Sequence, residues 1–204
     1  MSTQVVFASG NAGKLREMTA ILEPLGIELI AQREFAIEAV EETGQTFVEN
    51  AILKARQAAI ATGLPALADD SGLVVHSLGG APGVHSARFA GIGASDDENI
   101  DKLLDTLVDH EVKAARSAEF RCVIVFMTSD RDPSPVICDG RWPGHIAMQR
   151  SGRGGFGYDP VFVPTGMQDS AASLTQAEKN RVSHRGQALA SLTPALSVWL
   201  ARAD

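Results

Sequence analysis

The sequence predicts an α/β protein with a mixed β-sheet. Short apolar strands alternate with capped helices along the first 110 residues, which is typical of βα units. Two longer strands follow at 118–128 and 136–146, separated by a turn that contains Pro133 and Pro135. This spacing predicts an antiparallel hairpin, and a hairpin beside alternating units makes the sheet mixed.

The first elements form a strand–helix–strand unit. Residues 4–8 form an apolar strand, 9–13 are turn residues, and 14–25 have the apolar spacing of a helix that ends at Gly26. A second strand is expected at 28–31.

Later helices are marked by capping boxes, in which a hydroxyl and a carboxylate three residues on satisfy each other's free backbone N–H groups. The boxes are Thr46 with Glu49, Ser95 with Glu98, and Thr175 with Glu178. We expect helices from the first box to about residue 62 and from the second to about residue 110, and a final helix over 183–202.

Composition limits the kind of protein. A chain of 204 residues can bury one good core, or two small lobes that share a sheet. Its net charge of −7 excludes a surface that coats a nucleic acid polymer, but it allows a site for a single nucleotide. The N-terminus lacks the basic flank of a signal peptide, and no apolar run approaches the roughly 20 residues of a membrane span. With Cys122 and Cys138 expected as free thiols, these features predict a cytoplasmic protein without a membrane partner.

The most informative local feature is a pair of adjacent carboxylates, Asp69 and Asp70. They end an uncharged run from Leu64 and precede Ser71-Gly72, which predicts a buried strand that stops at a tight turn. Like charges at the end of a buried strand need a cation to neutralise them, and ligands bind at strand ends in α/β sheets. The alternative is that Asp69 caps the turn and Asp70 faces water.

A glycine-containing turn, 9–14, lies between the first strand and the first helix. Small residues, a helix N-terminus and the charge of Lys14 suit the binding of a phosphate. The turn is neither a Walker A loop nor a Rossmann fingerprint, because its glycine spacing differs from both. The alternative is an ordinary turn with a solvated lysine.

Three further segments carry polar or stacking groups. Glu41-Glu42 precede a helix on which Asn50 and Lys54 share a face, and that face could line a cleft or meet water. The glycine-rich segment 152–157 presents Phe156 either as a stacking platform for a base or as part of a core bulge.

The third segment places two basic side chains at a helix start. His184 and Arg185 follow Ser183, a good N-cap residue. Cations there oppose the helix dipole, and such a broken local rule points to function. The alternative is a basic turn that faces solvent.

Taken in order, these segments resemble the inosine/xanthosine triphosphate pyrophosphatase family. The matching motifs are Ser9-Gly-Asn-x-x-Lys14, Glu41-Glu-Thr-Gly-x-Thr-Phe-x-Glu-Asn-Ala51 with Lys54-Ala55, Ala68-Asp-Asp-Ser-Gly-Leu73, Gly79-Gly-Ala-Pro-Gly-Val-His-Ser-Ala-Arg88, Gly155-Phe-Gly-Tyr-Asp-Pro-Val-Phe162, and Lys179 with Ser183-His-Arg-Gly186. They span almost the whole chain, and none departs from the family pattern.

The resemblance implies an elongated, two-lobed α/β fold around a long central mixed β-sheet with flanking helices. It implies one domain over 1–204, a substrate cleft between the lobes, and a homodimer. It further implies Mg²⁺ as cofactor, held by Glu41 and Asp70, with Asp70 also the general base. The implied substrate-binding residues are Ser9, Gly10, Asn11, Ala12, Gly13 and Lys14 for the triphosphate, then Ser71, then Phe156, Gly157, Tyr158 and Asp159 around the base, and Lys179, His184 and Arg185 at its 6-keto edge.

The implied activity is hydrolysis of deaminated purine nucleoside triphosphates (dITP, ITP, XTP and dXTP) to the monophosphate and pyrophosphate, which removes aberrant purines from the nucleotide pool. Water would attack the α-phosphorus, and oxygen ligands suit the Mg²⁺ that this needs. Buried donors aimed at O6 would penalise adenine by about 1–3 kcal/mol per unpaired group. Two other classes stay open: a nucleotide-binding regulatory module without turnover, and a pyrophosphatase of pyrimidine nucleotides.

Overall fold

The computed structural model describes residues 2–37 and 40–203. Within them, six strands form one sheet in the order β2-β1-β3-β4-β5-β6. β1 runs parallel to both β2 and β3, whereas β5 and β6 are antiparallel, so the predicted mixed sheet is confirmed. The strands are β1 (Thr3–Phe7), β2 (Ile27–Ala31), β3 (Ala66–Val75), β4 (Ser117–Met127), β5 (Val136–Ile146) and β6 (Phe162–Pro164).

The predicted capping boxes are present at the starts of α2, α3 and α4, with both reciprocal hydrogen bonds in each. The helices are α1 (Ala12–Leu22), α2 (Phe47–Thr62), α3 (Asp96–Thr106), α4 (Gln176–Val182) and α5 (His184–Ala203). Gly63 ends α2 with a φ of 67°, a left-handed conformation that costs glycine little. The sequence therefore located these helix starts correctly.

The chain divides into two compact units. Unit 1 comprises Met1–Asp70, Cys122–Asp139 and Gln187–Asp204, and unit 2 comprises Ser71–Arg121 and Gly140–Gly186. The division falls inside β3, β4, β5 and α5 rather than in linkers. Consecutive residues of one strand, such as those on either side of the break in β3, therefore belong to different units.

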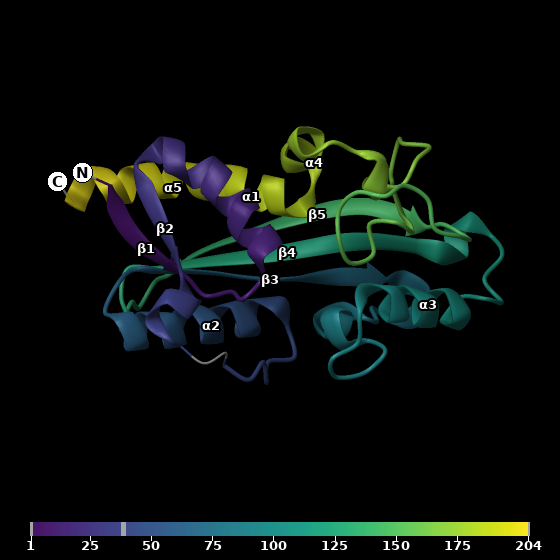
Figure 1. Ribbon diagram of the computed structural model, residues 1–204, viewed down its shortest axis with the longest axis horizontal. Coiled ribbons are helices and arrows are strands. Elements are labelled where there is room, and N and C mark those ends of the chain that lie inside the picture. Colours follow the sequence, from purple (N-terminus) through teal and green to yellow (C-terminus); the bar gives the residue numbers. More distant parts are fainter. Residues whose placement is uncertain (1, 38–39, 204) are drawn as a thin grey trace. The chain divides into compact units, whose positions relative to one another are not determined.

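In unit 1, helices cover both faces of the strands. Figure 1 shows α1 and α5 on one face of β1 and β3, with α2 on the opposite face. Val5 and Phe7 of β1 pack in one cluster with Met18 of α1, whereas Val6 and Ala8 pack in another with the alanines of α2. This alternation follows because successive strand residues point to opposite faces.

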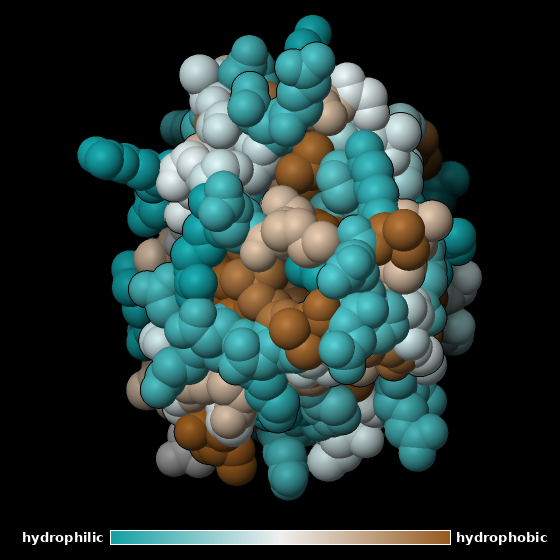
Figure 2. Space-filling model, turned by 90° about the vertical axis from the view of Figure 1, so that its right-hand side faces the viewer, coloured by the Kyte–Doolittle hydropathy of each residue, from teal (hydrophilic) through white to brown (hydrophobic). Residues whose placement is uncertain are grey.

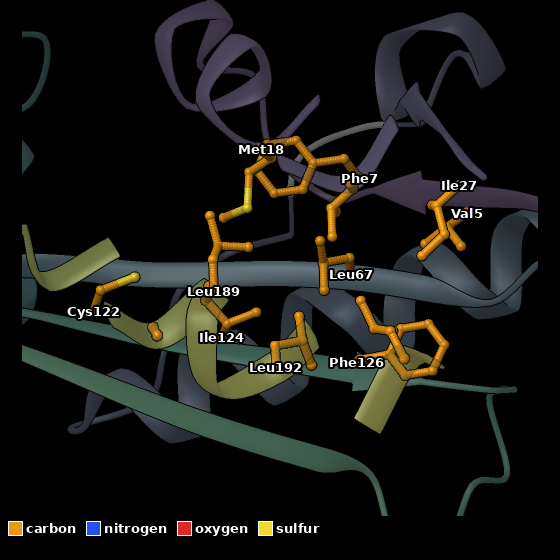
Figure 3. Close-up of a cluster of buried hydrophobic side chains, with 13 residues drawn as sticks. Val5, Phe7, Met18, Ile27, Leu67, Cys122, Ile124, Phe126, Leu189 and Leu192 are labelled. Atoms are coloured by element: carbon orange, nitrogen blue, oxygen red, sulfur yellow. The ribbon is translucent and has the colours of Figure 1, made fainter. Parts of the chain in front are cut away.

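The cluster between the strands and the α1–α5 layer is drawn in Figure 3. Met18 lies against Phe7, and Leu189 and Leu192 reach from α5 toward Leu67 of β3. Cys122 belongs to the same cluster, and it forms no disulfide bond with the half-buried Cys138. The prediction that the two cysteines remain thiols is therefore confirmed.

The core of unit 2 packs α3 against the strands. Ile100 and Leu103 of α3 join Val75, Phe120 and Trp142 in one buried cluster. The face of this unit drawn in Figure 2 has a hollow with hydrophobic side chains in it and hydrophilic side chains around it. Hydrophobic groups thus reach the surface of unit 2 as well as fill its core.

The structure corrects one important boundary. β3 does not stop at the predicted Ser71-Gly72 turn but continues to Val75. Leu73 and Val75 are fully buried in the core of unit 2, and this burial outweighs the turn preference of Ser-Gly. Asp69 and Asp70 therefore lie in the middle of a strand and not at its end.

Other boundaries differ less. α1 ends at Leu22 and the chain continues as a 3₁₀ turn, Glu23–Leu25, because Pro24 has no N–H with which to extend the helix. α3 ends at Thr106, earlier than expected, and the short β6 was not predicted. Among the described residues, no helix is both long and apolar enough to cross a bilayer.

Candidate active site

The adjacent carboxylates of β3 are both buried, and each is paired with a lysine from a different helix. Asp69 is 1% exposed and Asp70 is 6% exposed. Because neighbouring strand residues point to opposite faces, Asp69 meets Lys14 of α1 and Asp70 meets Lys54 of α2. The predicted need for a cation is confirmed, and the alternative in which Asp70 faces water is wrong.

Asp69 forms an ion pair with the helix that follows β1. Its Oδ2 lies 2.9 Å from Lys14 Nζ, and the Cys122 thiol contacts the same oxygen at 4.0 Å. The Lys14 side chain is only 16% exposed, so it is not the solvated lysine of the alternative interpretation. Lys14 is thereby held over the face of β3 that α1 covers.

The turn at 9–14 is held by its own side chains. The carboxamide oxygen of Asn11 accepts hydrogen bonds from the backbone N–H groups of Gly13 (2.8 Å) and Lys14 (3.0 Å), and so caps α1. The N–H of Asn11 in turn donates to Ser9 Oγ at 3.2 Å. These three amides already have acceptors, so the Lys14 side chain is the clearest anion-binding group of the turn.

Asp70 is held by two side chains of α2. Lys54 Nζ lies 3.0 Å from Asp70 Oδ1 and 2.9 Å from Glu42 Oε1, so it bridges the two carboxylates. The fully buried Asn50 donates to Asp70 Oδ2 at 3.2 Å and accepts from the N–H of Gly44 at 2.8 Å. We call Lys14, Asp69, Asp70, Lys54, Glu42 and Asn50 the acid–lysine cluster.

Burial and charge shift the acidities of this cluster. Burial raises the pKa of Asp70, although the charge of Lys54 opposes the shift. Burial lowers the pKa of Lys54, but the carboxylates of Asp70, Asp69 and Glu42 outweigh it and raise the pKa overall. Lys54 therefore stays charged, and Asp70 is a stronger base than an exposed aspartate.

Glu41, expected as a metal ligand, is exposed, whereas its neighbour Glu42 is half-buried and joined to Asp70 through Lys54. The part of the chain that the structure describes holds no group of three or more His, Cys, Asp or Glu side chains able to bind a metal ion. Mg²⁺ suits a site of one or two carboxylates that phosphate oxygens and water complete, and the carboxylates of Asp70 and Glu41 are donors of that kind.

Unit 2 carries a second group of predicted residues, which surround an aromatic ring. Lys179 Nζ lies 4.6 Å and the Arg185 guanidinium 5.7 Å from the centre of the Phe156 ring. Asp159 forms a buried ion pair with Lys179 at 2.5 Å and accepts from the N–H of Phe156 at 2.9 Å. Phe156 is 36% exposed, so its ring is a partly open surface and not a core residue.

The basic residues at the start of α5 are buried. His184 is 5% and Arg185 is 3% exposed, so the solvent-facing alternative is wrong. The His184 ring stacks on Phe120, with centroids 4.8 Å apart and planes inclined by 12°. Arg185 donates to Ser71 Oγ at 3.3 Å. We call Phe156, Asp159, Lys179, His184, Arg185 and Ser71 the ring–cation cluster.

Two members of the predicted base-binding segment have contacts within the protein. Tyr158 is 4% exposed and its hydroxyl donates to the carbonyl of Ser86 at 2.8 Å. Gly157 donates its N–H to Asp96 Oδ2 at 2.6 Å. Unlike Phe156, the Tyr158 side chain therefore belongs to the core of unit 2.

Sequence reasoning left Asn50, Lys54 and Asp69 out of the predicted site. The four-residue spacing of Asn50 and Lys54 did place them on one helix face, but the amphipathic pattern does not say what that face meets. The pairing with Asp70 depends on how α2 packs on β3, which sequence spacing does not encode.

Comparison with known proteins places the chain in a family. The model of the Ham1 family matches residues 5–195. The chain belongs to the Ham1 family. Its similarity to individual members also extends over nearly the whole length.

The Ham1 relatives include enzymes and solved structures. The chain is 53% identical over 193 residues to the dITP/XTP pyrophosphatase of Salmonella typhimurium, covering 95% of this chain and 98% of that protein. It is 54% identical, with the same coverage, to the dITP/XTP pyrophosphatase of Pectobacterium atrosepticum. The structure of a HAM1 protein from Coxiella burnetii has a TM-score of 0.90 at 52% identity, covering 96% of this chain and 98% of that one. The Staphylococcus aureus Ham1 protein has a TM-score of 0.82 at 38% identity, with coverages of 99% and 100%.

Proposed function

We propose that the protein hydrolyses deaminated purine nucleoside triphosphates, namely dITP, ITP, XTP and dXTP, to the nucleoside monophosphate and pyrophosphate. The observation that carries this proposal is the buried Asp70, whose two carboxylate oxygens are oriented by Lys54 and Asn50. The similarity to dITP/XTP pyrophosphatases over 95% of the chain supports the choice of substrate.

In this proposal, Asp70 is the general base that takes a proton from the attacking water. Burial raises the pKa of Asp70, so it accepts that proton more readily than an exposed aspartate does. Lys54 and Asn50 hold the carboxylate in place. A group that is oriented before the reaction stabilises the transition state more, because no reorganisation is needed when the reaction occurs.

Lys14 is proposed to stabilise the charge that develops on the leaving pyrophosphate. It is held by the buried Asp69 at 2.9 Å, so its ammonium group does not need to be ordered when substrate binds. The turn at 9–14 contributes the helix N-terminus, whose partial positive charge favours phosphate.

We propose Mg²⁺ as the cofactor, with Asp70 and Glu41 as its protein ligands. When bound, the ion would neutralise phosphate charge. The oxygen donors of Asp70 fit a hard cation, and the raised pKa that burial gives this carboxyl is what a nearby divalent charge would offset.

The ring–cation cluster is proposed to read the base. The partly open Phe156 ring offers a stacking surface for a purine, and Lys179, His184 and Arg185 supply N–H donors for a 6-keto edge. An amino group at that position would leave buried donors unpaired, which disfavours ATP. We further propose that the chain acts as one domain over 1–204 and as a homodimer, for which analytical ultracentrifugation is the direct test.

The experiment that tests the function is a substrate panel. Pyrophosphate release is measured with ITP, dITP, XTP, ATP, dTTP and UTP in the presence of Mg²⁺. We expect ITP, dITP and XTP to be cleaved far faster than ATP. Faster cleavage of dTTP or UTP would assign the protein to pyrimidine nucleotides, and tight binding of ITP without turnover would make it a regulatory module.

The same assay with a chelator tests the cofactor. We expect turnover to stop while the melting temperature stays unchanged, because Mg²⁺ completes the site with substrate phosphates and does not hold the fold together. A large drop in melting temperature on chelation would show a structural metal instead.

A further inference from the structure

The segment Gly79–Arg88 matches a family motif, but the proposed chemistry gives it no role. In the structure it follows β3 and ends in a 3₁₀ helix, Gly83–Arg88, in which Ser86 is buried at 8% exposure. Ser86 Oγ accepts a hydrogen bond from the backbone N–H of Leu73 at 2.9 Å and donates to the carbonyl of Gly83 at 2.6 Å. Ser86 therefore attaches this helical turn to β3, two residues after Ser71.

Ser86 is also joined to the loop that carries Phe156. Its carbonyl accepts the hydrogen bond of the Tyr158 hydroxyl at 2.8 Å, and the Tyr158 ring is packed in the buried cluster of unit 2. Burial raises the pKa of Tyr158, so the hydroxyl stays protonated and remains a donor. The backbone of β3, the side chain and carbonyl of Ser86, and the hydroxyl of Tyr158 thus form one connected path.

Two backbone N–H groups of the loop also donate hydrogen bonds. The N–H of Phe156 donates to Asp159 at 2.9 Å, and the N–H of Gly157 donates to Asp96 at 2.6 Å. The Gly157 contact is at the exposed start of α3, and Asp159 belongs to the loop itself. Of these three hydrogen bonds, that of Tyr158 is the one whose partner, the buried Ser86, is itself joined to β3.

We propose that Ser86 and Tyr158 are positioning residues for purine selection: together they form a buried Ser86–Tyr158 brace that sets the place of the Phe156 ring beside Lys179 and Arg185. Tyr158 then acts through Phe156 and does not touch the base. The inference rests on the proposed function in one respect, namely that the ring–cation cluster reads the base.

Tyr158→Phe is the most direct test, because it removes the hydroxyl and keeps the packed ring. In the full chain with Mg²⁺, we expect KM for ITP to rise roughly three- to tenfold, as the loss of one net hydrogen bond does to an equilibrium. The kcat should stay within about twofold, because the phosphate chemistry is untouched. The preference for ITP over ATP should fall, because the Phe156 ring is no longer held in place beside Lys179 and Arg185. Ser86→Ala should act in the same direction.

A readout independent of nucleotides is amide hydrogen exchange over residues 155–159, which we expect to be faster in Tyr158→Phe. Thr193→Val is the matched control, because it removes a hydroxyl-to-carbonyl hydrogen bond within α5, from Thr193 to Leu189 (3.0 Å). It should leave both readouts unchanged.

The outcomes separate the two claims. Unchanged exchange at 155–159 would overturn the brace, whatever the kinetics. Faster exchange with unchanged KM and unchanged ITP/ATP preference would overturn its role in purine selection, as would an equal KM rise in Thr193→Val. If the wild-type protein failed to cleave ITP, the proposed function would be rejected, and the claim of a role in purine selection with it.

Discussion

The two units use their buried charges differently. In unit 1, the acid–lysine cluster pairs Asp69 and Asp70, which point to opposite faces of β3, with one lysine each from a helix. In unit 2, the ring–cation cluster contains the buried ion pair Asp159–Lys179, and Arg185 and His184 lie against aromatic rings.

The difference indicates which part of a nucleotide the side chains of each unit are suited to bind. Oriented carboxylates and ammonium groups interact with phosphate, water and metal through charge, which does not depend on the shape of a base. A partly open ring with planar cations beside it favours a flat, hydrogen-bonding heterocycle. Changes in unit 1 should therefore affect all nucleotides alike, whereas changes in unit 2 should affect some bases more than others.

The largest expected effect is that of Asp70→Asn. The amide keeps the shape but loses the proton acceptor and the negative charge, so kcat for ITP should fall roughly 10²- to 10⁴-fold at saturating Mg²⁺. XTP and ATP turnover should fall in parallel. Asp109→Asn, on an exposed side chain, is the control for the substitution itself. Turnover within a few-fold of the wild type would remove Asp70 as the base.

Lys14→Ala should have the next largest effect. Removing one oriented charge at the leaving group should cost about 2–4 kcal/mol in kcat/KM, equally for ITP and ATP. Lys113→Ala, which removes an exposed lysine, is the matched control. A changed ITP/ATP preference with unchanged kcat/KM for ITP would place Lys14 at the base instead of the phosphates.

Arg185→Ala should show the contrast between the units. We expect kcat/KM for ITP to fall by about 1–3 kcal/mol, with a smaller change for ATP, because a guanidinium can donate in parallel to O6 and N7 of a keto-purine. Arg181→Ala on the exposed side of α4 serves as the control. Equal losses for both nucleotides together with a lower melting temperature would assign Arg185 to folding, through its contact with Ser71.

The smallest expected effect is a displacement of the acid limb of the pH profile. Burial raises the pKa of Asp70, so the base becomes protonated, and kcat/KM falls, at a pH above the ordinary aspartate value of about 3.9. The profile for ITP, measured at low Mg²⁺ so that the metal does not shift the carboxyl, tests this. An acid limb at or below the ordinary value would contradict it.

Fold stability must be followed over the same pH range. Hydrogen bonds from the Thr46 side chain and backbone lower the pKa of Glu49 in the α2 capping box. A lowered folded-state pKa gives stability that is present above the unfolded pKa and is lost as the pH falls through the folded one. Melting curves at each pH therefore separate the protonation of Asp70 from the weakening of helix starts.

Much of the fold could be predicted because its signals are local. A capping box such as Ser95 with Glu98 depends on a three-residue spacing, and the α2 end at Gly63 depends on one backbone conformation. Where the prediction was wrong, a distant contact decided the outcome: Ser71-Gly72 is turn-like locally, yet the burial of Leu73 keeps β3 extended.

The sequence by itself determined the helix starts, the mixed sheet, the absence of a disulfide between the two cysteines and the family motifs, because each depends on neighbouring residues or on the order of segments. Only the tertiary structure decided that Asp69 and Asp70 face different lysines, and that Tyr158 is attached to Ser86. The reason is that a strand alternates its faces locally, but which helix covers each face depends on packing between segments that are far apart in the chain.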